Sequence, residues 1–193
     1  MEFFYFLGLW LGDGFVNING NSHDIYLTIG KEENELAEFY DNLVKTVFNR
    51  DCVHVHKQKE NTRRFTHKEL ALFLNKEFGK TAYNKRIPDW VKEAAPSLKL
   101  AFLQGYLDSD GSVFYDNGKV RVNFTSVNLE LLEDIQDILY GLEISNSIVM
   151  HQKRNKNAFG GVSLESYRIN ITRCDNLKLA QNPVFESRKI KVL

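Results

Sequence analysis

Two stretches of the chain repeat one pattern, and this repetition constrains the possible folds more than any other feature. FLGLWLGDGFV at residues 6–16 and FLQGYLDSDGSV at residues 102–113 are apolar runs that end in aspartate and glycine. The two aspartates, Asp13 and Asp110, lie 97 positions apart, about half of the 193 residues. A pattern that recurs at this distance indicates an internal duplication of a unit of roughly 95 residues.

The segments that follow each aspartate also come in one order. Two alternating strand-like runs come first, then an amphipathic helix, two further strands and a short final helix. The final helices are expected at residues 67–78 and 174–181, and Asn117-Gly118 predicts a hairpin turn in the second half. Each half is therefore predicted to be an αββαββα unit.

Small residues recur at a spacing of four within both apolar helices. Gly8 and Gly12 lie in the first helix, and Gly105 and Ser109 lie in the second. Small residues on one helix face allow two helices to approach closely, because little side-chain volume separates the backbones. We therefore expect the two helices to pack on each other about a pseudo-two-fold axis.

The predicted fold class is α+β, a tandem pseudo-symmetric duplication with the two apolar helices packed at the interface. The first repeat is expected at residues 1–96 and the second at residues 97–193. Ser97 follows a proline and stands where the N-cap of the second apolar helix would be. The strands of each repeat are expected to form an antiparallel sheet.

The charge is balanced overall but unevenly distributed. Lys plus Arg and Asp plus Glu number 25 each, so the formal net charge is zero. Residues 50–68 and 150–173 contain predicted strands and each have a local charge of +4, whereas 32–44 and 128–147 each carry five acids and no Lys or Arg. The same order of signs in both halves predicts one basic sheet surface backed by acidic helices. The alternative is that these runs are only solvated faces.

Cysteine usage and hydropathy exclude several classes of protein. Cys52 and Cys174 lie far apart and form no CxxC pattern, so neither a disulfide framework nor a zinc site is expected, and a reducing cytoplasm fits. The apolar run Phe3–Leu11 is too short to span a bilayer and lacks the flanks of a signal peptide. We expect a cytoplasmic protein with no membrane partner.

The ends of the two apolar helices predict a metal site. The carboxyl end of a helix has unpaired carbonyls and a partial negative charge, so an aspartate there is unfavourable. If the helices pack as expected, Asp13 and Asp110 converge, and their repulsion favours a cation between them. Carboxylate, carbonyl and water oxygens suit Mg²⁺, and we expect Mn²⁺ to substitute for it.

The two stretches resemble the paired motifs of the LAGLIDADG homing endonucleases, in the single-chain form with two motifs. The resemblance covers the whole chain: both motifs, their spacing and the repeated order of elements. The family's metal-binding acid, at the eighth motif position, falls on Asp13 in FLGLWLGDG and on Asp110 in LQGYLDSDG. The sixth position, often also acidic in the family, is Leu11 in the first motif and Asp108 in the second. This departure leaves Asp108 a structural or helix-ending role.

A second resemblance is local. NKRIPDWV at residues 84–91 is similar to the Lys-x-Ile-Pro block that precedes the second motif in endonuclease domains embedded in inteins. In those domains the lysine enters the active site, which implies a catalytic role for Lys85; the alternative is a surface lysine before a helix. Either Arg188 or Lys189 is the counterpart in the second half, and we take Lys189 as the candidate catalytic residue.

The resemblance implies a site-specific DNA endonuclease that hydrolyses both strands of a long asymmetric duplex with a divalent metal. Asp13 and Asp110 would be the metal ligands, with the backbone oxygens of Gly12 and Ser109 assisting, in a two-metal manner. Lys85 would stabilise charge at the scissile phosphate. The implied partner is double-stranded DNA, bound by a monomer that is cytoplasmic with access to DNA.

Two other functions of this fold are weighed against cleavage. A DNA-binding regulator of the same fold would lack the motif acids, whereas both are present here. An RNA maturase that assists intron splicing remains open as an alternative. Residue 1 is Met1 rather than a Cys or Ser nucleophile, and the chain ends in Leu193 rather than Asn, so we expect no splicing activity. A free-standing enzyme and an endonuclease cut from or fused to intein segments both remain open.

The strands are expected to read the DNA. Alternation places polar side chains on one face of each strand, and such residues contact base edges and phosphates in the major groove. Each residue alone could equally be a solvated strand residue. The predicted DNA-binding set is Asn17, Asn19, Tyr26, Thr28, His54, His56, Gln58, Arg63, Arg121, Asn123, Thr125, Gln152, Arg154, Arg168 and Asn170.

Overall fold

The first half of the chain contains the predicted series of elements. The structure is a computed structural model, and it describes residues 1–31, 33–57, 60–117, 119–153, 155–156, 162–163 and 165–171. The elements of the first half are α1 (Glu2–Asp13), β1 (Gly14–Asn19), β2 (Ser22–Gly30), α2 (Asn34–Phe48), β3 (Val53–Lys57), β4 (Glu60–Thr66) and α3 (Lys68–Phe78). The αββαββα order predicted for this half is confirmed.

The second half repeats the order as far as it is described. A short helix, α4 (Asp89–Lys92), lies in the join. The elements that follow are α5 (Pro96–Ser109), β5 (Gly111–Asp116), β6 (Lys119–Ser126), α6 (Leu129–Gly141), β7 (Asn146–Gln152), β8 (Asn155–Lys156), β9 (Val162–Ser163) and β10 (Ser166–Ile171). The helix predicted at 174–181 lies outside the described residues. The expected N-cap at Ser97 is wrong, because α5 already begins at Pro96 and its N-cap is Ala95.

The two main sheets have the same topology. The first has the strand order β1-β2-β4-β3 and the second has the order β5-β6-β10-β7, and every pair of neighbours is antiparallel. In both sheets the first two strands form a hairpin, and the other two strands extend the sheet from the second strand of that hairpin. The short strands β8 and β9 form a separate two-stranded ribbon, inserted between β7 and β10. The predicted α+β duplication is therefore confirmed.

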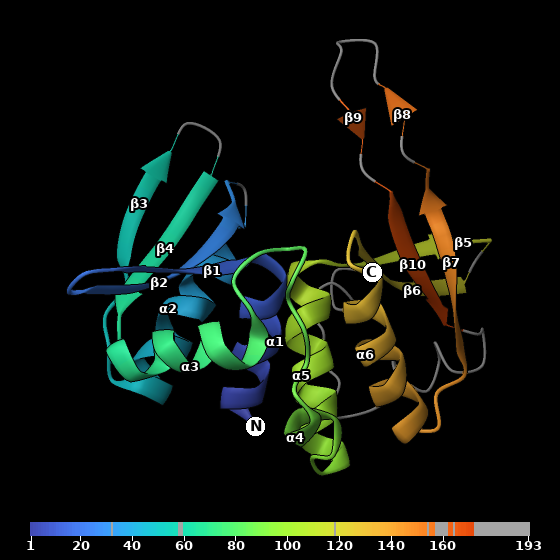
Figure 1. Cartoon of the computed structure of the whole chain (residues 1–193), viewed down its shortest axis with the longest axis horizontal. Helices are drawn as coiled ribbons and strands as arrows, with labels where there is room; N and C mark the ends of the chain where they lie inside the picture. Colours follow the sequence, from blue (N-terminus) through green and yellow to red (C-terminus); the bar gives the residue numbers. More distant parts are fainter. Residues whose placement is uncertain are drawn as a thin grey trace.

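Helices α1 and α5 form the centre of the molecule. Figure 1 shows them side by side, with one four-stranded sheet on either side of the pair. A Cβ atom added at Gly8 would lie 1.9 Å from the backbone oxygen of Phe102, and one added at Gly105 would lie 2.0 Å from that of Tyr5. The helix backbones are therefore in direct contact, as the spacing of small residues predicted.

The remaining helices cover one face of each sheet. Helices α2 and α3 pack on the first sheet and α6 packs on the second (Figure 1). Helix α2 buries Leu36, Tyr40 and Val44, which are spaced four residues apart and therefore lie on one side of the helix. Among the described residues, no helix has the length and apolar character needed to cross a membrane.

Candidate active site

The two motif aspartates lie where the central helices end. Asp13 is the last residue of α1, and Asp110 follows directly on α5 as its C-cap residue. A Cβ atom added at Gly12 would lie 2.0 Å from Ser109 Oγ and 3.1 Å from the backbone nitrogen of Asp110. The carboxyl ends of the two helices are thus in contact, and this contact brings the two aspartates to the same end of the helix pair.

Lys85 also lies at this place. Lys85 is only 6% exposed, although its side chain ends in a primary ammonium group. Its Nζ donates hydrogen bonds to the backbone oxygens of Leu11 at 2.5 Å, Gly12 at 3.0 Å and Gly14 at 2.9 Å. These bonds satisfy carbonyls at the carboxyl end of α1 and place a positive charge against its negative end. The alternative of a surface lysine is therefore wrong.

The charges of both motif acids, Asp13 and Asp110, act on the Lys85 ammonium. Burial lowers the pKa of Lys85 to about 8, although the carboxylates of Asp110 and Asp13 act in the opposite direction and favour the ammonium. One ammonium is therefore within electrostatic reach of the acids of both motifs. The Lys85 Nζ also lies 5.4 Å from the ring centroid of Trp10, which is fully buried. The ring shields one side of the ammonium from water.

Asp108, the additional acid of the second motif, is held in a buried contact. The hydroxyl of Tyr5 donates a hydrogen bond of 2.8 Å to its Oδ2, across the interface between α1 and α5. Asp108 is 3% exposed. Its carboxylate links the two central helices, which agrees with the structural role expected for it.

The donor chemistry at the helix ends fits a hard divalent cation. Asp13 and Asp110 supply carboxylate oxygens, and the carbonyl of Gly12 keeps a second lone pair while accepting the bond from Lys85. In the part of the chain that the structure describes, no group of three or more His, Cys, Asp or Glu residues is placed to hold a metal. A cation at the helix ends would therefore be held by two carboxylates together with carbonyl and water oxygens, a set typical of Mg²⁺.

The first sheet presents part of the predicted reading set on its helix-free face. Asn17 and Asn19 of β1 are exposed, and Tyr26 and Thr28 of β2 are half-buried. The ring of Phe15 stacks on Tyr26 with 4.5 Å between centroids and an interplanar angle of 3°. Phe15 is missing from the predicted set, although strand alternation places it on the same face as Asn17 and Asn19.

Two residues of the predicted reading set lie on the other face of this sheet. Arg63 is 4% exposed and donates from Nε to both carboxylate oxygens of Asp41 in α2, at 3.0 and 3.1 Å. His54 pairs with Arg63 across the sheet and lies 3.1 Å from the same carboxylate. The placement of Arg63 and His54 on the reading face is therefore wrong. Val53 of β3 instead pairs with Arg64, which pairs with Tyr26, so this valine lies on the helix-free face.

The residues of the second sheet that were predicted to contact DNA differ in their exposure and in their partners. Arg121 is half-buried and forms an ion pair with Asp116 of its own hairpin at 3.1 Å. Asn123 lies in the expected row, opposite Ser112 and Asn170, but it is only 6% exposed.

The rest of the predicted set is distributed between the end of the second sheet, β3 and undescribed parts of the chain. Arg168 pairs with Thr125 across the sheet, and its Nη2 lies 2.8 Å from His151 Nε2. Gln152 is exposed at the end of β7. His56 pairs with Asn61 in the first sheet. Four candidates lie outside the described residues: Gln58, Arg154, Arg188 and Lys189.

A family model matches the second half of the chain. Residues 97–180 match the model of the LAGLIDADG-like domain, and the match includes the second motif with Asp110. The predicted resemblance to LAGLIDADG proteins is confirmed. The match begins one residue after the start of α5.

Curated relatives are much longer than this chain. It is 28% identical over 181 residues to the DNA polymerase of Thermococcus hydrothermalis, covering 91% of this chain and 10% of the polymerase. It is 24% identical over 185 residues to the ATP-dependent DNA helicase Hel308 of Thermococcus kodakarensis, covering 93% of this chain and 16% of the helicase. The chain thus spans about a tenth of the length of the polymerases it matches.

Solved structures with a similar fold include the homing endonuclease I-DmoI. In complex with DNA and Mn, I-DmoI aligns with a TM-score of 0.69 at 20% identity, covering 97% of both chains. I-DmoI has also been solved with DNA and Ca, and as a variant with its target DNA in the presence of Mg. The N-terminal LAGLIDADG domain of DUF199/WhiA aligns with a TM-score of 0.58 at 13% identity. These likenesses establish that the part of the chain that the structure describes has the fold of the LAGLIDADG homing endonuclease I-DmoI.

Proposed function

We propose that this protein is a site-specific DNA endonuclease that hydrolyses both strands of a long duplex target with a divalent metal. The observation that supports this most strongly is the buried Lys85 ammonium, which both motif aspartates influence at the abutting ends of α1 and α5. A structural protein has no need for two acids and a buried lysine where two helix carboxyl ends meet. The fold shared with I-DmoI, which was solved with its target DNA, is consistent with this proposal.

The roles of the site residues follow from their charges and positions. Asp13 and Asp110 would hold Mg²⁺, with the backbone oxygens of Gly12 and Ser109 assisting. Mg²⁺ held there would act as a Lewis acid and would lower the pKa of water in contact with it. Lys85 keeps a positive charge beside the two carboxylates, where it would stabilise charge that develops on the scissile phosphate. Lys189, outside the described residues, is proposed as its counterpart for the other strand.

The DNA would lie along the helix-free faces of the two sheets. The pseudo-symmetric pair of sheets flanks the central helices (Figure 1), so one sheet would contact each half of the target. Asn17, Asn19 and Tyr26 would contact the first half-site, and Arg121 and Arg168 the second, because such side chains pair with base edges and phosphates. The remaining proposed contacts are Thr28, Thr125, Asn170 and Gln152.

The curated relatives suggest a context for the activity. The chain matches about a tenth of each DNA polymerase, so we propose that it corresponds to an endonuclease segment inserted into such longer proteins, as in inteins. We propose two repeats, residues 1–96 and 97–193, that act together as a monomer in a compartment where DNA is accessible.

The first prediction tests the two acids. Asp13→Asn and Asp110→Asn should each reduce double-strand cleavage on the order of a hundredfold or more, because losing one ligand removes several kcal/mol of metal-assisted stabilisation. DNA binding should persist, since the amide removes a charge that repels phosphate. The target is first selected by cleavage of a plasmid library with Mg²⁺, and rates and affinities are then measured on that target.

The matched control for these substitutions is Asp137→Asn. Asp137 is an exposed acid of α6 away from the helix ends, so the same change of charge there should leave cleavage at the wild-type rate. Near wild-type cutting by Asp13→Asn would show that the site has been assigned to the wrong residues. A protein that binds intron RNA and leaves every duplex intact would instead support the RNA maturase.

A further inference from the structure

Both halves of the molecule hold the backbone of Lys85. The Lys85 N–H donates to the backbone oxygen of Thr81 at 3.0 Å, within the first half. The Lys85 carbonyl accepts a hydrogen bond of 2.7 Å from Nδ2 of Asn128, which lies 43 positions later. Asn128 is the N-cap residue of α6, and its Oδ1 also accepts from the N–H of Leu131 at 3.2 Å. One buried amide therefore caps a helix of the second repeat and holds the lysine at the first motif.

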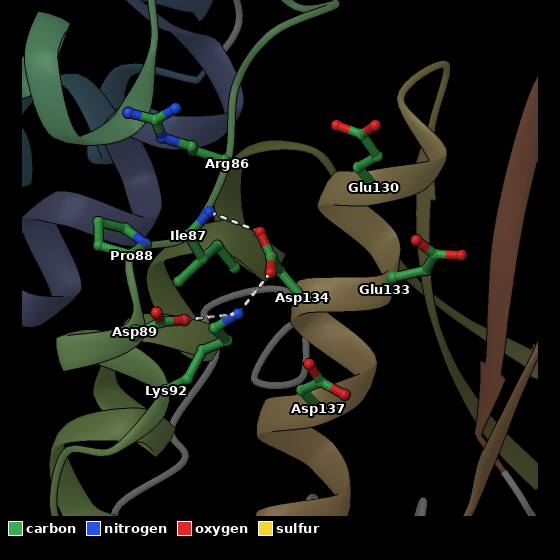
Figure 2. Close-up of a pocket in the computed structure, with 9 residues that line it drawn as sticks. All are labelled: Arg86, Ile87, Pro88, Asp89, Lys92, Glu130, Glu133, Asp134 and Asp137. Atoms are coloured by element: carbon green, nitrogen blue, oxygen red, sulfur yellow. Dashed lines mark hydrogen bonds and ion pairs between the residues drawn. The ribbon is translucent and has the colours of Figure 1, made fainter.

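A second contact fixes the same segment two residues later. The N–H of Ile87 donates to Oδ2 of Asp134 in α6 at 2.8 Å. The other carboxylate oxygen of Asp134 accepts a hydrogen bond of 2.9 Å from Lys92 Nζ, and Lys92 also pairs with Asp89 at 3.0 Å. Figure 2 shows Asp134 pointing from α6 toward both partners, whereas Glu133 of the same helix points away.

The two contacts hold neighbouring groups of one short segment. Asn128 and Asp134 are six positions apart, so they differ by about 9 Å along the axis of α6. They hold the carbonyl of Lys85 and the N–H of Ile87, which a single residue separates. The segment therefore lies against α6, with Asn128 at one end and Asp134 at the other.

We propose that Asn128 and Asp134 are positioning residues, through which helix α6 of the second repeat sets the place of Lys85 at the carboxyl end of α1. This inference rests on the proposed endonuclease function and adds a dependence between the repeats. A long lysine side chain gives up considerable rotamer freedom when it is held on three carbonyls, and it can be held there only from a fixed backbone position. A displacement of about 1 Å at a catalytic group can lower a rate on the order of a hundredfold.

The dependence predicts an effect on one strand only. Lys85 and Lys189 are proposed to serve one strand each, and Lys85 lies on the carbonyls at the end of the first motif helix. Displacing Lys85 should therefore slow the cut in one strand and leave an excess of DNA nicked in the other. Lys85→Met, which removes the ammonium itself, identifies that strand and sets the largest effect to be expected.

Asn128→Asp separates positioning from helix capping. The aspartate keeps an acceptor oxygen for Leu131 N–H, so the cap of α6 is retained, but it has no N–H to donate to the Lys85 carbonyl. We expect a decrease on the order of tenfold in the cleavage rate of the strand identified with Lys85→Met, with affinity for DNA nearly unchanged. Gln136→Glu is the matched control, because Gln136 lies in the same helix and donates instead to Asn146 at 2.9 Å.

Asp134 gives a graded second test. Asp134→Ala removes the acceptor for Ile87 N–H and should slow the same strand, whereas Asp134→Asn keeps an acceptor oxygen and should recover part of that rate. Rates are measured for each strand separately, on a duplex labelled at both ends.

The position of Lys85 can also be measured without any DNA cleavage. Reductive methylation followed by peptide mass spectrometry reports how accessible its amine is, and the buried amine should be protected in the wild-type protein and in Gln136→Glu. Asn128→Asp and Asp134→Ala should label faster at Lys85 even if no duplex is ever cut, which separates this inference from the proposed function. Equal slowing of both strands in parallel with lost stability, or unchanged labelling in both variants, would overturn the positioning role.

Discussion

Cys52 is a thiol that its neighbours keep protonated. Its pKa is raised to about 12, first by burial and then by the charge of the Asp41 carboxylate and a hydrogen bond to it, while Arg63 opposes the shift. The thiolate is the nucleophilic form, so a raised pKa makes Cys52 less reactive wherever the solution pH lies below that value. The Asp41 carboxylate, which holds Arg63 on the helix-covered face of the first sheet, therefore also lowers the reactivity of the Cys52 thiol.

Alkylation measures this effect directly. At pH 8 the folded protein should react with iodoacetamide at Cys52 on the order of a thousandfold more slowly than an ordinary thiol. Asp41→Asn should accelerate the reaction, because it removes the charge that disfavours the thiolate. Rates are followed by mass spectrometry in a Cys174→Ser background, with the urea-unfolded chain as reference. A folded-state rate equal to the unfolded rate would contradict the environment described for Cys52.

Single residues were predictable where a motif carried them and not where tertiary contacts decided. Asp13 and Asp110 followed from the repeated pattern, and Lys85 from a local resemblance. Arg63 and His54 were misplaced because alternation defines two strand faces without showing which one faces α2, where both residues contact Asp41. Asp134 was overlooked because an acid within an amphipathic helix is usually solvated; only the tertiary fold brings Ile87 against it.

The pairing of α1 with α5 was the element-scale prediction that the sequence supported best. Small residues spaced by four predicted a close contact, because the spacing is a property of the helix itself. By contrast, the β8–β9 ribbon is formed by two strands of two residues each, too short to show alternation. The cap of α5 could not be predicted either, since a helix can begin at a proline without a side-chain cap.

Gly8→Ala tests the contact between these helices. The new Cβ would lie 1.9 Å from a backbone oxygen of Phe102, so the helices must separate. We expect a loss of about 1–3 kcal/mol or more in the free energy of unfolding, as for other overpacked sites, measured by urea denaturation. Cleavage should fall as well, since separated helices move Asp13 away from Asp110.

Gly141→Ala is the control for that substitution. At Gly141 the new Cβ would meet only Nζ at the end of the Lys99 side chain, at 3.0 Å, and no backbone atom, and alanine favours the helix. Its stability should therefore stay close to that of the wild type. If Gly8→Ala were as stable as Gly141→Ala, the backbones of α1 and α5 would have to lie further apart than described.

At the scale of the whole molecule, the two sheets share a topology but not a surface. Gly14 pairs with Leu27 in the first sheet as Gly111 pairs with Phe124 in the second. Counting from these pairs along β2 and β6, Asp24 and Tyr26 of the first sheet stand where Arg121 and Asn123 stand in the second. Equivalent positions therefore differ in charge and in chemistry, which the repeated pattern alone did not reveal.

This divergence predicts an asymmetric target. A homodimer of identical halves reads a palindrome, because the symmetry of the protein is mirrored in its site, whereas one chain with two different sheets has no such constraint. We expect a monomer to bind an asymmetric duplex of roughly two helical turns, one turn for each sheet. Deep sequencing of cleaved random sites gives the consensus, and light scattering of the complex gives its mass.

Arg121→Ala then assigns one half of that target to the second sheet. The present partner of Arg121, Asp116, forms an ion pair at the surface that contributes little stability, so the guanidinium is free to turn toward a base edge. Its loss should relax selectivity by about 1–3 kcal/mol at one position, in one half-site only. Arg64→Ala, on the helix-free face of the first sheet, should act only on the other half-site. A palindromic consensus, or an Arg121→Ala effect shared by both half-sites, would contradict two sheets that read separately.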